Sequence, residues 1–263
     1  MSFACAATTV HPRDRILATV SHELRQPLNL IQMHAEILTR LPVAIEYPAV
    51  ARVGDMIKRA VQSQGRIIDD LLELSRARTG KLVLERTPVD IGNLLATLTA
   101  ALSSEASGRQ PLIDLVASTP AVCIGDRTRI EQIMGNLLRN AIRFTPNHGR
   151  IRLAVGRDGA FCKVSVADNG CGISAEFLPH VFGMFNQEAQ PSSPSDTGLG
   201  IGLALVQELA VAHGGRVEAH SNGPGRGAEF IVWLPAHNES LQDSPASIAK
   251  GVLIASDDCG VIP

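Results

Sequence analysis

The sequence predicts an α+β protein with more than one domain, in which a helical hairpin forming a dimeric four-helix bundle precedes an α/β sandwich. Apolar residues recur with a helical period up to about Gly80, and short strand-like runs alternate with helices after Thr87-Pro88. The chain of 263 residues, 45% hydrophobic and 19% charged, is long enough to build two hydrophobic cores.

Composition narrows the classes of partner. The 24 Lys and Arg residues nearly balance the 26 Asp and Glu residues, so a large cationic field for nucleic acid or an anionic membrane is missing. No apolar run approaches the roughly 18 residues of a spanning helix, and the N-terminus lacks a secretory signal pattern. The five cysteines are scattered without zinc or redox spacing. We therefore expect a cytoplasmic protein with reduced thiols, no nucleic-acid partner and no direct membrane insertion.

The first helix is expected from about Arg13 to Arg40, because its apolar residues are spaced by three and four positions in turn. Two prolines between Leu41 and Pro48 break the pattern. A second stripe then runs from Val53 to Leu74 and ends at Thr79-Gly80. A two-helix hairpin cannot bury both stripes by itself, so residues 11–80 predict a homodimer.

A separate α/β domain is expected over residues 88–236. Asp126 is placed to cap a helix that runs to about Phe144, a further helix is expected at Gly200 to Ala212, and Asn186 to Asp196 reads as a loop. The expected strands are Leu112 to Val116, Val122 to Gly125, Ile151 to Gly156, Phe161 to Ala167, Arg216 to Ala219 and Glu229 to Leu234. Residues 237–263 are expected to be a polar linker followed by a lone apolar strand at Gly251 to Asp258.

His22 lies almost opposite the apolar stripe of the first helix and is expected to face solvent. The simplest interpretation is a surface histidine without a role. Its neighbours favour chemistry: the Glu23 carboxylate can fix the imidazole tautomer and make the other ring nitrogen a better nucleophile, and Pro27 weakens the helix one turn later.

Three short motifs suggest a nucleotide site. Asn136 and Asn140 share one helical face, where an amide oxygen suits a magnesium ion carried by phosphates, although a pair bonded to nearby backbone is equally consistent. Asp168-Asn-Gly-Cys-Gly172 follows an apolar strand and is either a plain turn or a site where a carboxylate accepts the adenine amine. Thr197 to Leu203 is glycine-rich and leads into a helix N-terminus that suits polyphosphate, without the pattern of a P-loop or of a dinucleotide fold.

The string Ser21-His-Glu-Leu-Arg-Gln-Pro-Leu28 closely resembles the phosphoacceptor box of dimeric sensor histidine kinases. The resemblance implies that His22 is autophosphorylated and that Glu23 acts as its orienter or general base. Gln26 stands where many relatives have Thr or Asn, which argues against phosphatase activity. Together with Gly225 to Phe230, the three nucleotide motifs resemble the ATP-binding domain of the same family, which shares its fold with gyrase-type ATPases and the large heat-shock chaperone.

The resemblance, which covers about residues 11 to 236, implies ATP and Mg²⁺ as cofactors. Asn140 would bind the metal, and Asp168 would recognise adenine. A lid would contain Phe182 and Phe185, and Ala228 replaces a frequent Ser or Thr. The implied ATP-binding residues are Asn136, Asn140, Arg143, Phe144, Asp168, Gly170, Gly172, Thr197, Gly198, Leu199, Gly200 and Gly202.

Two other functions compete with the kinase: a gyrase-like ATPase and a nucleotide-binding scaffold without catalysis. Hydrolysing relatives carry a glutamate where this chain has Asn136, and a degenerate scaffold would have lost Asn140, Asp168 or the glycines. We therefore expect two-component signalling, with ATP-dependent phosphorylation of His22 and transfer to an aspartate of a response regulator or receiver domain. Val252 to Asp258 resembles the first strand of a receiver domain, which implies a piece of a hybrid kinase or a truncated gene; an unstructured tail is the alternative.

Overall fold

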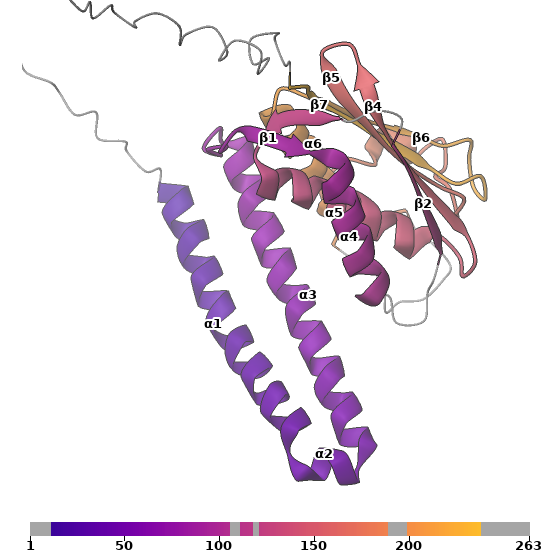
Figure 1. Ribbon diagram of the computed structural model, residues 1–263. Helices are drawn as coiled ribbons and strands as arrows, with labels where there is room; N and C mark the ends of the chain where they lie inside the picture. Colours follow the sequence, from indigo (N-terminus) through magenta and orange to yellow (C-terminus); the bar gives the residue numbers. More distant parts are fainter. Residues whose placement is uncertain (1–11, 106–110, 118–120, 189–198, 238–263) are drawn as a thin grey trace, which may run out of the picture.

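The computed structural model describes residues 12–105, 111–117, 121–188 and 199–237. Figure 1 shows a long helical hairpin whose upper end lies beside a layered α/β part. The expected α+β architecture, with a hairpin followed by a sandwich, is confirmed.

The hairpin is formed by α1 (Pro12–Arg40) and α3 (Pro48–Arg78), which pack along their length in antiparallel order. The turn differs from the expected plain break, because it holds a short helix, α2 (Pro42–Glu46). Pro42 and Pro48 each begin a helix, where a missing backbone N–H costs nothing. Tyr47 lies between α2 and α3 and is 55% exposed.

Five strands form the main sheet in the order β2-β4-β5-β7-β6. Strands β2 and β4 pair in parallel, and all other neighbours pair antiparallel. A separate two-stranded sheet joins β1 and β3. The bounds are β1 Thr87–Asp90, β2 Leu112–Ala117, β3 Val122–Gly125, β4 Arg150–Asp158, β5 Phe161–Asp168, β6 Arg216–His220 and β7 Glu229–Pro235.

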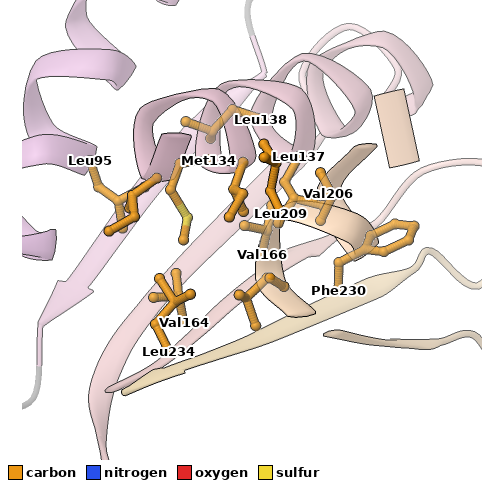
Figure 2. Packing of buried hydrophobic residues seen from close by; sticks show 14 of the residues in the cluster. Leu95, Met134, Leu137, Leu138, Val164, Val166, Val206, Leu209, Phe230 and Leu234 are labelled. Carbon is orange, nitrogen blue, oxygen red and sulfur yellow. The ribbon is translucent and has the colours of Figure 1, made fainter. Parts of the chain in front are cut away.

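Helices α4 (Ile91–Glu105), α5 (Arg127–Phe144) and α6 (Gly202–Ala212) lie on one side of the main sheet (Figure 1). Figure 2 shows side chains of α5 and α6 facing those of β5 and β7 across this layer. Examples with 0% exposure are Leu137 and Leu209 from the helices and Val164 and Leu234 from the sheet. This packing supplies the dominant stabilisation, because each such side chain contributes about 1.5–3 kcal/mol when removed from water.

The opposite face of the sheet carries Trp233, which is nevertheless only 5% exposed. The guanidinium carbon of Arg216 lies 4.0 Å from the centre of the Trp233 ring, and the Lys163 amine lies 5.6 Å from it. The indole Nε1–H donates to Asp158 at 2.9 Å. Long cationic side chains therefore cover a sheet face that α4, α5 and α6 leave open.

Contacts between α3 and the α/β part join the two parts of the molecule. Leu74 of α3 is 1% exposed and belongs to the same hydrophobic cluster as α5 and α6. Glu73 forms an ion pair with Arg129 of α5, and Gln132 donates to Asp70 at 3.1 Å. At the end of α3, Arg78 pairs with Glu208 of α6 at 2.8 Å.

All six expected strands form, and the helix capped by Asp126 spans Arg127–Phe144. Asp126 accepts hydrogen bonds from the backbone N–H groups of Thr128 at 2.9 Å and Arg129 at 3.2 Å. The predicted start of the last helix, at Gly200, is wrong by two residues. Gly200 has a φ of 70°, which a helix does not allow, so α6 begins at Gly202.

Candidate nucleotide-binding site and phosphoacceptor helix

The candidate acceptor His22 and its neighbour Glu23 lie within α1, and the structure describes α1 side chains only from Arg25 onward. Arg25 forms an ion pair with Asp69 of α3. Because α1 and α3 are antiparallel with the same rise per residue, His22 lies level with Leu72, three residues beyond Asp69. The candidate acceptor is thus level with the part of α3 where Asp70 and Glu73 contact α5.

The C-terminal half of α5 carries four of the expected site residues. Asn136 is 9% exposed, and its carbonyl oxygen accepts a hydrogen bond from Arg139 at 2.8 Å. Its amide nitrogen is buried without a hydrogen-bond partner among the described residues. Asn140 follows one turn later and is half-buried. The Arg143 guanidinium stacks 5.0 Å from the centre of the Phe144 ring.

Asp168 ends β5, and its carboxylate accepts the backbone N–H of Gly170 at 2.8 Å. Burial raises the pKa of the Asp168 carboxyl, and the backbone N–H groups of Gly170 and Ala228 oppose the rise. A half-buried carboxylate held by backbone donors suits recognition of one amine in a fixed direction.

Close backbone contacts explain the glycines around Asp168. A Cβ on Gly170 would overlap the carbonyl oxygen of Phe144, and one on Gly172, whose φ is 68°, would overlap that of Gly223. The Cys171 N–H donates to the Phe144 carbonyl at 3.2 Å. The end of α5 and the turn after Asp168 are therefore fixed together.

The glycine-rich segment is described from Leu199 onward, and the expected contacts of Thr197 and Gly198 lie outside the described residues. Leu199 is 46% exposed. A Cβ on Gly200 would come within 2.7 Å of the backbone carbonyl oxygen of Asn186. A Cβ on Gly202 would lie 3.4 Å from the side-chain carbonyl oxygen of Asn136. The start of α6 therefore lies directly against α5.

The two expected lid phenylalanines have different surroundings. Phe182 packs edge-on against Phe230 of β7, with ring centres 6.3 Å apart. Phe185 is 60% exposed, has a φ of 60°, and donates its N–H to the Gly200 carbonyl at 3.1 Å. A positive φ is unusual for a residue with a bulky side chain. This conformation places an exposed aromatic ring next to the glycine-rich segment.

The structure thus brings together the described members of the predicted site. Helix α5 contacts the Asp168 turn through Phe144 and the glycine-rich segment through Asn136. The N-terminus of α6 adds to the same region backbone N–H groups that have no acceptor within the helix. These three pieces lie far apart in the sequence.

Sequence reasoning missed two residues that shape this site. Arg139 engages the Asn136 carbonyl, and Ser221 bonds to both glycine turns beside Asp168. Arg139 has a helical signal, since it follows Asn136 by three positions and so shares its face. Ser221 lies in a loop, where side-chain direction has no periodic signature.

The residues fit a purine nucleoside triphosphate with a hard cation. The buried Asn136 amide nitrogen has hydrogen-bonding capacity that the described residues do not use, and the half-buried Asp168 carboxylate can accept an amine. The Asn140 oxygen is a hard ligand of the kind Mg²⁺ takes alongside phosphate oxygens.

Comparison with known families agrees with this geometry. Residues 13–80 match the His Kinase A (phospho-acceptor) domain, and residues 125–238 match the histidine kinase-, DNA gyrase B- and HSP90-like ATPase family. The two matches are separated by residues 81–124 and together cover about two thirds of the chain. The chain therefore carries both domains of the sensor histidine kinase catalytic core and belongs to that family.

Individual relatives support the same assignment. The alginate biosynthesis sensor protein KinB of Pseudomonas aeruginosa is 32% identical over 228 residues, which are 85% of this chain and 37% of KinB. The sensor histidine kinase GacS of Pseudomonas protegens is 31% identical over 254 residues, 92% of this chain and 27% of GacS. A crystal structure of full-length ShkA in complex with AMPPNP has a TM-score of 0.69 at 30% identity and covers 85% of this chain and 46% of ShkA.

This chain therefore spans less than half of the length of each of these three relatives. Among the described helices, none is long and apolar enough to cross a membrane.

Proposed function

We propose that the chain transfers the γ-phosphoryl group of ATP to His22 and then passes it to an aspartate of a response regulator or receiver domain. The observation that supports this best is the contact of α5 with both the Asp168 turn and the glycine-rich segment, beside a hairpin that carries His22. In the transfer, an imidazole nitrogen of His22 forms a bond to the γ-phosphorus while the bond to the β–γ bridging oxygen breaks and ADP leaves.

Each site residue has a proposed part in binding or orientation. Asp168 accepts the adenine amine, and Gly170 and Gly172 allow the base close to the backbone. The phosphates lie at Thr197, Gly198, Leu199, Gly200 and Gly202, with Arg143 and Phe144 at the end of α5. Glu23 holds one tautomer of His22 so that the other nitrogen stays unprotonated.

Asn140 is the proposed protein ligand of Mg²⁺, which when bound neutralises phosphate charge. The Asn136 amide cannot accept a proton from water, so this position gives no general base for hydrolysis. Bound ATP is then not hydrolysed before it reacts with His22. This absence of a general base distinguishes a kinase from an ATPase within the same fold.

The hairpin supports a homodimer. Described apolar residues on α1 and α3 remain exposed although they repeat at helical spacing, and a second copy would cover them. They are Leu30, Met33 and Ile37 on α1 and Val53 and Met56 on α3. We further propose a cytoplasmic location and a division into residues 11–80, 88–236 and 237–263. An origin in a hybrid kinase stays a prediction, because Val252 to Asp258 lies outside the described residues.

Phosphorylation of His22 is tested by incubating the chain with γ-labelled ATP and magnesium. We expect covalent label that is stable in alkali and labile in acid, and complete loss of label in His22→Gln. His34→Gln is the matched control, because His34 is an exposed histidine on the same helix. Full labelling of His22→Gln would contradict the proposal.

A further inference from the structure

Ser221 lies in the loop between β6 and β7 and forms hydrogen bonds with two separate turns. Its hydroxyl donates to the Gly227 carbonyl at 2.7 Å. The same oxygen accepts the N–H of Ile173 at 3.0 Å and that of Gly223 at 3.3 Å. A serine hydroxyl has one donor and two acceptor positions, so all three are in use.

The two turns joined by Ser221 are those that border Asp168. One follows Asp168 and reaches Ile173, and the other runs from Gly223 to Gly227. They are in such close contact that a Cβ on Gly172 would overlap the Gly223 carbonyl, and one on Gly227 would overlap the carbonyl of Asp168. Glycines make this approach sterically feasible, but they bring no side chain that could hold it.

Main-chain hydrogen bonds secure only the first part of this contact. The Asp168 N–H donates to Ala228 at 2.8 Å, Gly227 donates to Gly170 at 3.2 Å, and Gly225 donates to Cys171 at 2.6 Å. Beyond Cys171 the chain passes through Gly172, which has a φ of 68° and, without a Cβ, can leave this conformation at little steric cost. The bond from Ile173 to Ser221 anchors the far side of that glycine.

From this arrangement we infer that Ser221 is a positioning residue for nucleotide binding, which holds the two turns so that Asp168 and Gly170 are preorganised for adenine. The inference rests on the proposed ATP site and deepens it. A turn that is ordered before binding costs less free energy to fix when the ligand arrives. Ser221 therefore acts on ATP affinity, and it has no part in the phosphoryl transfer itself.

The test compares the Kd for ATP, measured by calorimetry with magnesium present, for the unaltered chain, Ser221→Ala, Ser221→Thr and Ser165→Ala. Ser221→Ala is expected to raise the Kd and the KM on the order of tenfold, with the labelling rate at saturating ATP unchanged. Ser221→Thr keeps the hydroxyl and is expected to restore affinity. Ser165 is the control, because its buried hydroxyl donates to Glu229 at 2.5 Å on the opposite sheet face.

An unchanged Kd in Ser221→Ala, or an equal loss of affinity in Ser165→Ala, would overturn the inference while leaving ATP binding intact. Failure of the unaltered chain to bind ATP would instead overturn the proposed function and the inference with it. A second measurement needs no variant: the N–H groups of Ile173 and Gly223 are expected to exchange hydrogen more slowly when ATP is bound. Exchange that ATP does not alter would also contradict a positioning role.

Discussion

At the scale of single residues, the carboxylate of Asp168 is the group whose chemistry is most narrowly set by its surroundings. Burial raises its pKa, and backbone N–H donors favour its charged form. An asparagine in this position would replace one carboxylate oxygen by an NH₂ group, which cannot accept a hydrogen bond from the backbone N–H groups or from the adenine amine. The cost of such a mismatch in a half-buried site exceeds that of a lost contact on the open surface.

Asp168→Asn is accordingly expected to weaken ATP binding by at least about tenfold, which corresponds to about 1.4 kcal/mol. Calorimetric titration with ATP and magnesium measures the change. Asp114→Asn serves as the control, because Asp114 is an exposed carboxylate on β2. Equal affinities for the two variants would show that Asp168 has no special part in binding.

A buried histidine connects the beginning of α5 with the end of α6. His213 is 1% exposed, its Nδ1 lies 2.7 Å from the Leu209 carbonyl, and its Nε2 accepts the Asp126 N–H at 3.1 Å. These partners require the neutral ring with its proton on Nδ1. Burial lowers the pKa of His213 below the usual 6.5.

The unfolded chain binds a proton at His213 at a higher pH than the folded chain does, so stability is complete above about pH 6.5 and decreases as pH falls through the folded pKa. We expect His213→Gln to be less stable at pH 7.5 and to lose less additional stability between pH 6.5 and 5. Thermal melting at a series of pH values checks both points. Parallel pH curves for the two proteins would exclude His213 as the source.

At the scale of elements, α3 belongs to the hairpin and also packs against the α/β part. The ion pair of Glu73 with Arg129 is well buried, since the two side chains are 11% and 22% exposed. Burial raises the pKa of Glu73, which Arg129 opposes. Removing the Arg129 guanidinium would leave the Glu73 carboxylate without its counter-charge and largely shielded from water.

Arg129→Gln is expected to cost about 3 kcal/mol and to lower the melting temperature by several degrees. Hydrogen exchange is expected to increase in α3 near Glu73. The control is Arg40→Gln, because Arg40 pairs with Glu36 at 2.6 Å on the exposed hairpin surface, where such pairs contribute little. An equal effect of the two substitutions would show that the ion pair of Glu73 with Arg129 does not stabilise the contact between α3 and α5.

The sequence predicted most elements, but not all of them. Periodicity identified α1 and α3, because their apolar residues recur at helical spacing, and short apolar runs identified the strands. Helix α4 and strand β1 were missed. The start of α4 contains Gly92 and Asn93, which are poor helix formers, and it depends on Asp90 accepting the Asn93 N–H at 3.1 Å. Strand β1 is four residues long and exists through its pairing with β3.

The candidate site divides in the same way. Asn136, Asn140, Asp168 and the glycines stand in local motifs that the sequence displays. Contacts between segments distant in sequence, such as those of Ser221 or of Glu73 with Arg129, depend on tertiary packing and leave no local pattern.

At the scale of the whole molecule, the unmatched apolar surface of the hairpin predicts self-association. Leu30 is 52% exposed and Ile37 is 49% exposed, and their spacing of seven places them on one helical face. Because each side chain is already about half buried, burying the rest in a four-helix bundle would contribute roughly 0.8–1.5 kcal/mol per residue.

We expect the chain to sediment as a dimer at micromolar concentration and Leu30→Glu with Ile37→Glu to sediment as a monomer. Val211→Glu is the control, because Val211 is 60% exposed on α6, which is not part of the hairpin. A folded, unaltered chain that sediments as a monomer would refute the four-helix bundle.

The covered tryptophan on the outer sheet face has a practical consequence for studies of unfolding. The chain has one tryptophan and one tyrosine: Trp233 lies in β7, and Tyr47 lies at the hairpin turn. Indole fluorescence therefore reports on the sheet alone, and tyrosine absorbance reports on the hairpin. Two native chromophores thus allow the melting of the two parts to be followed separately without attaching a label.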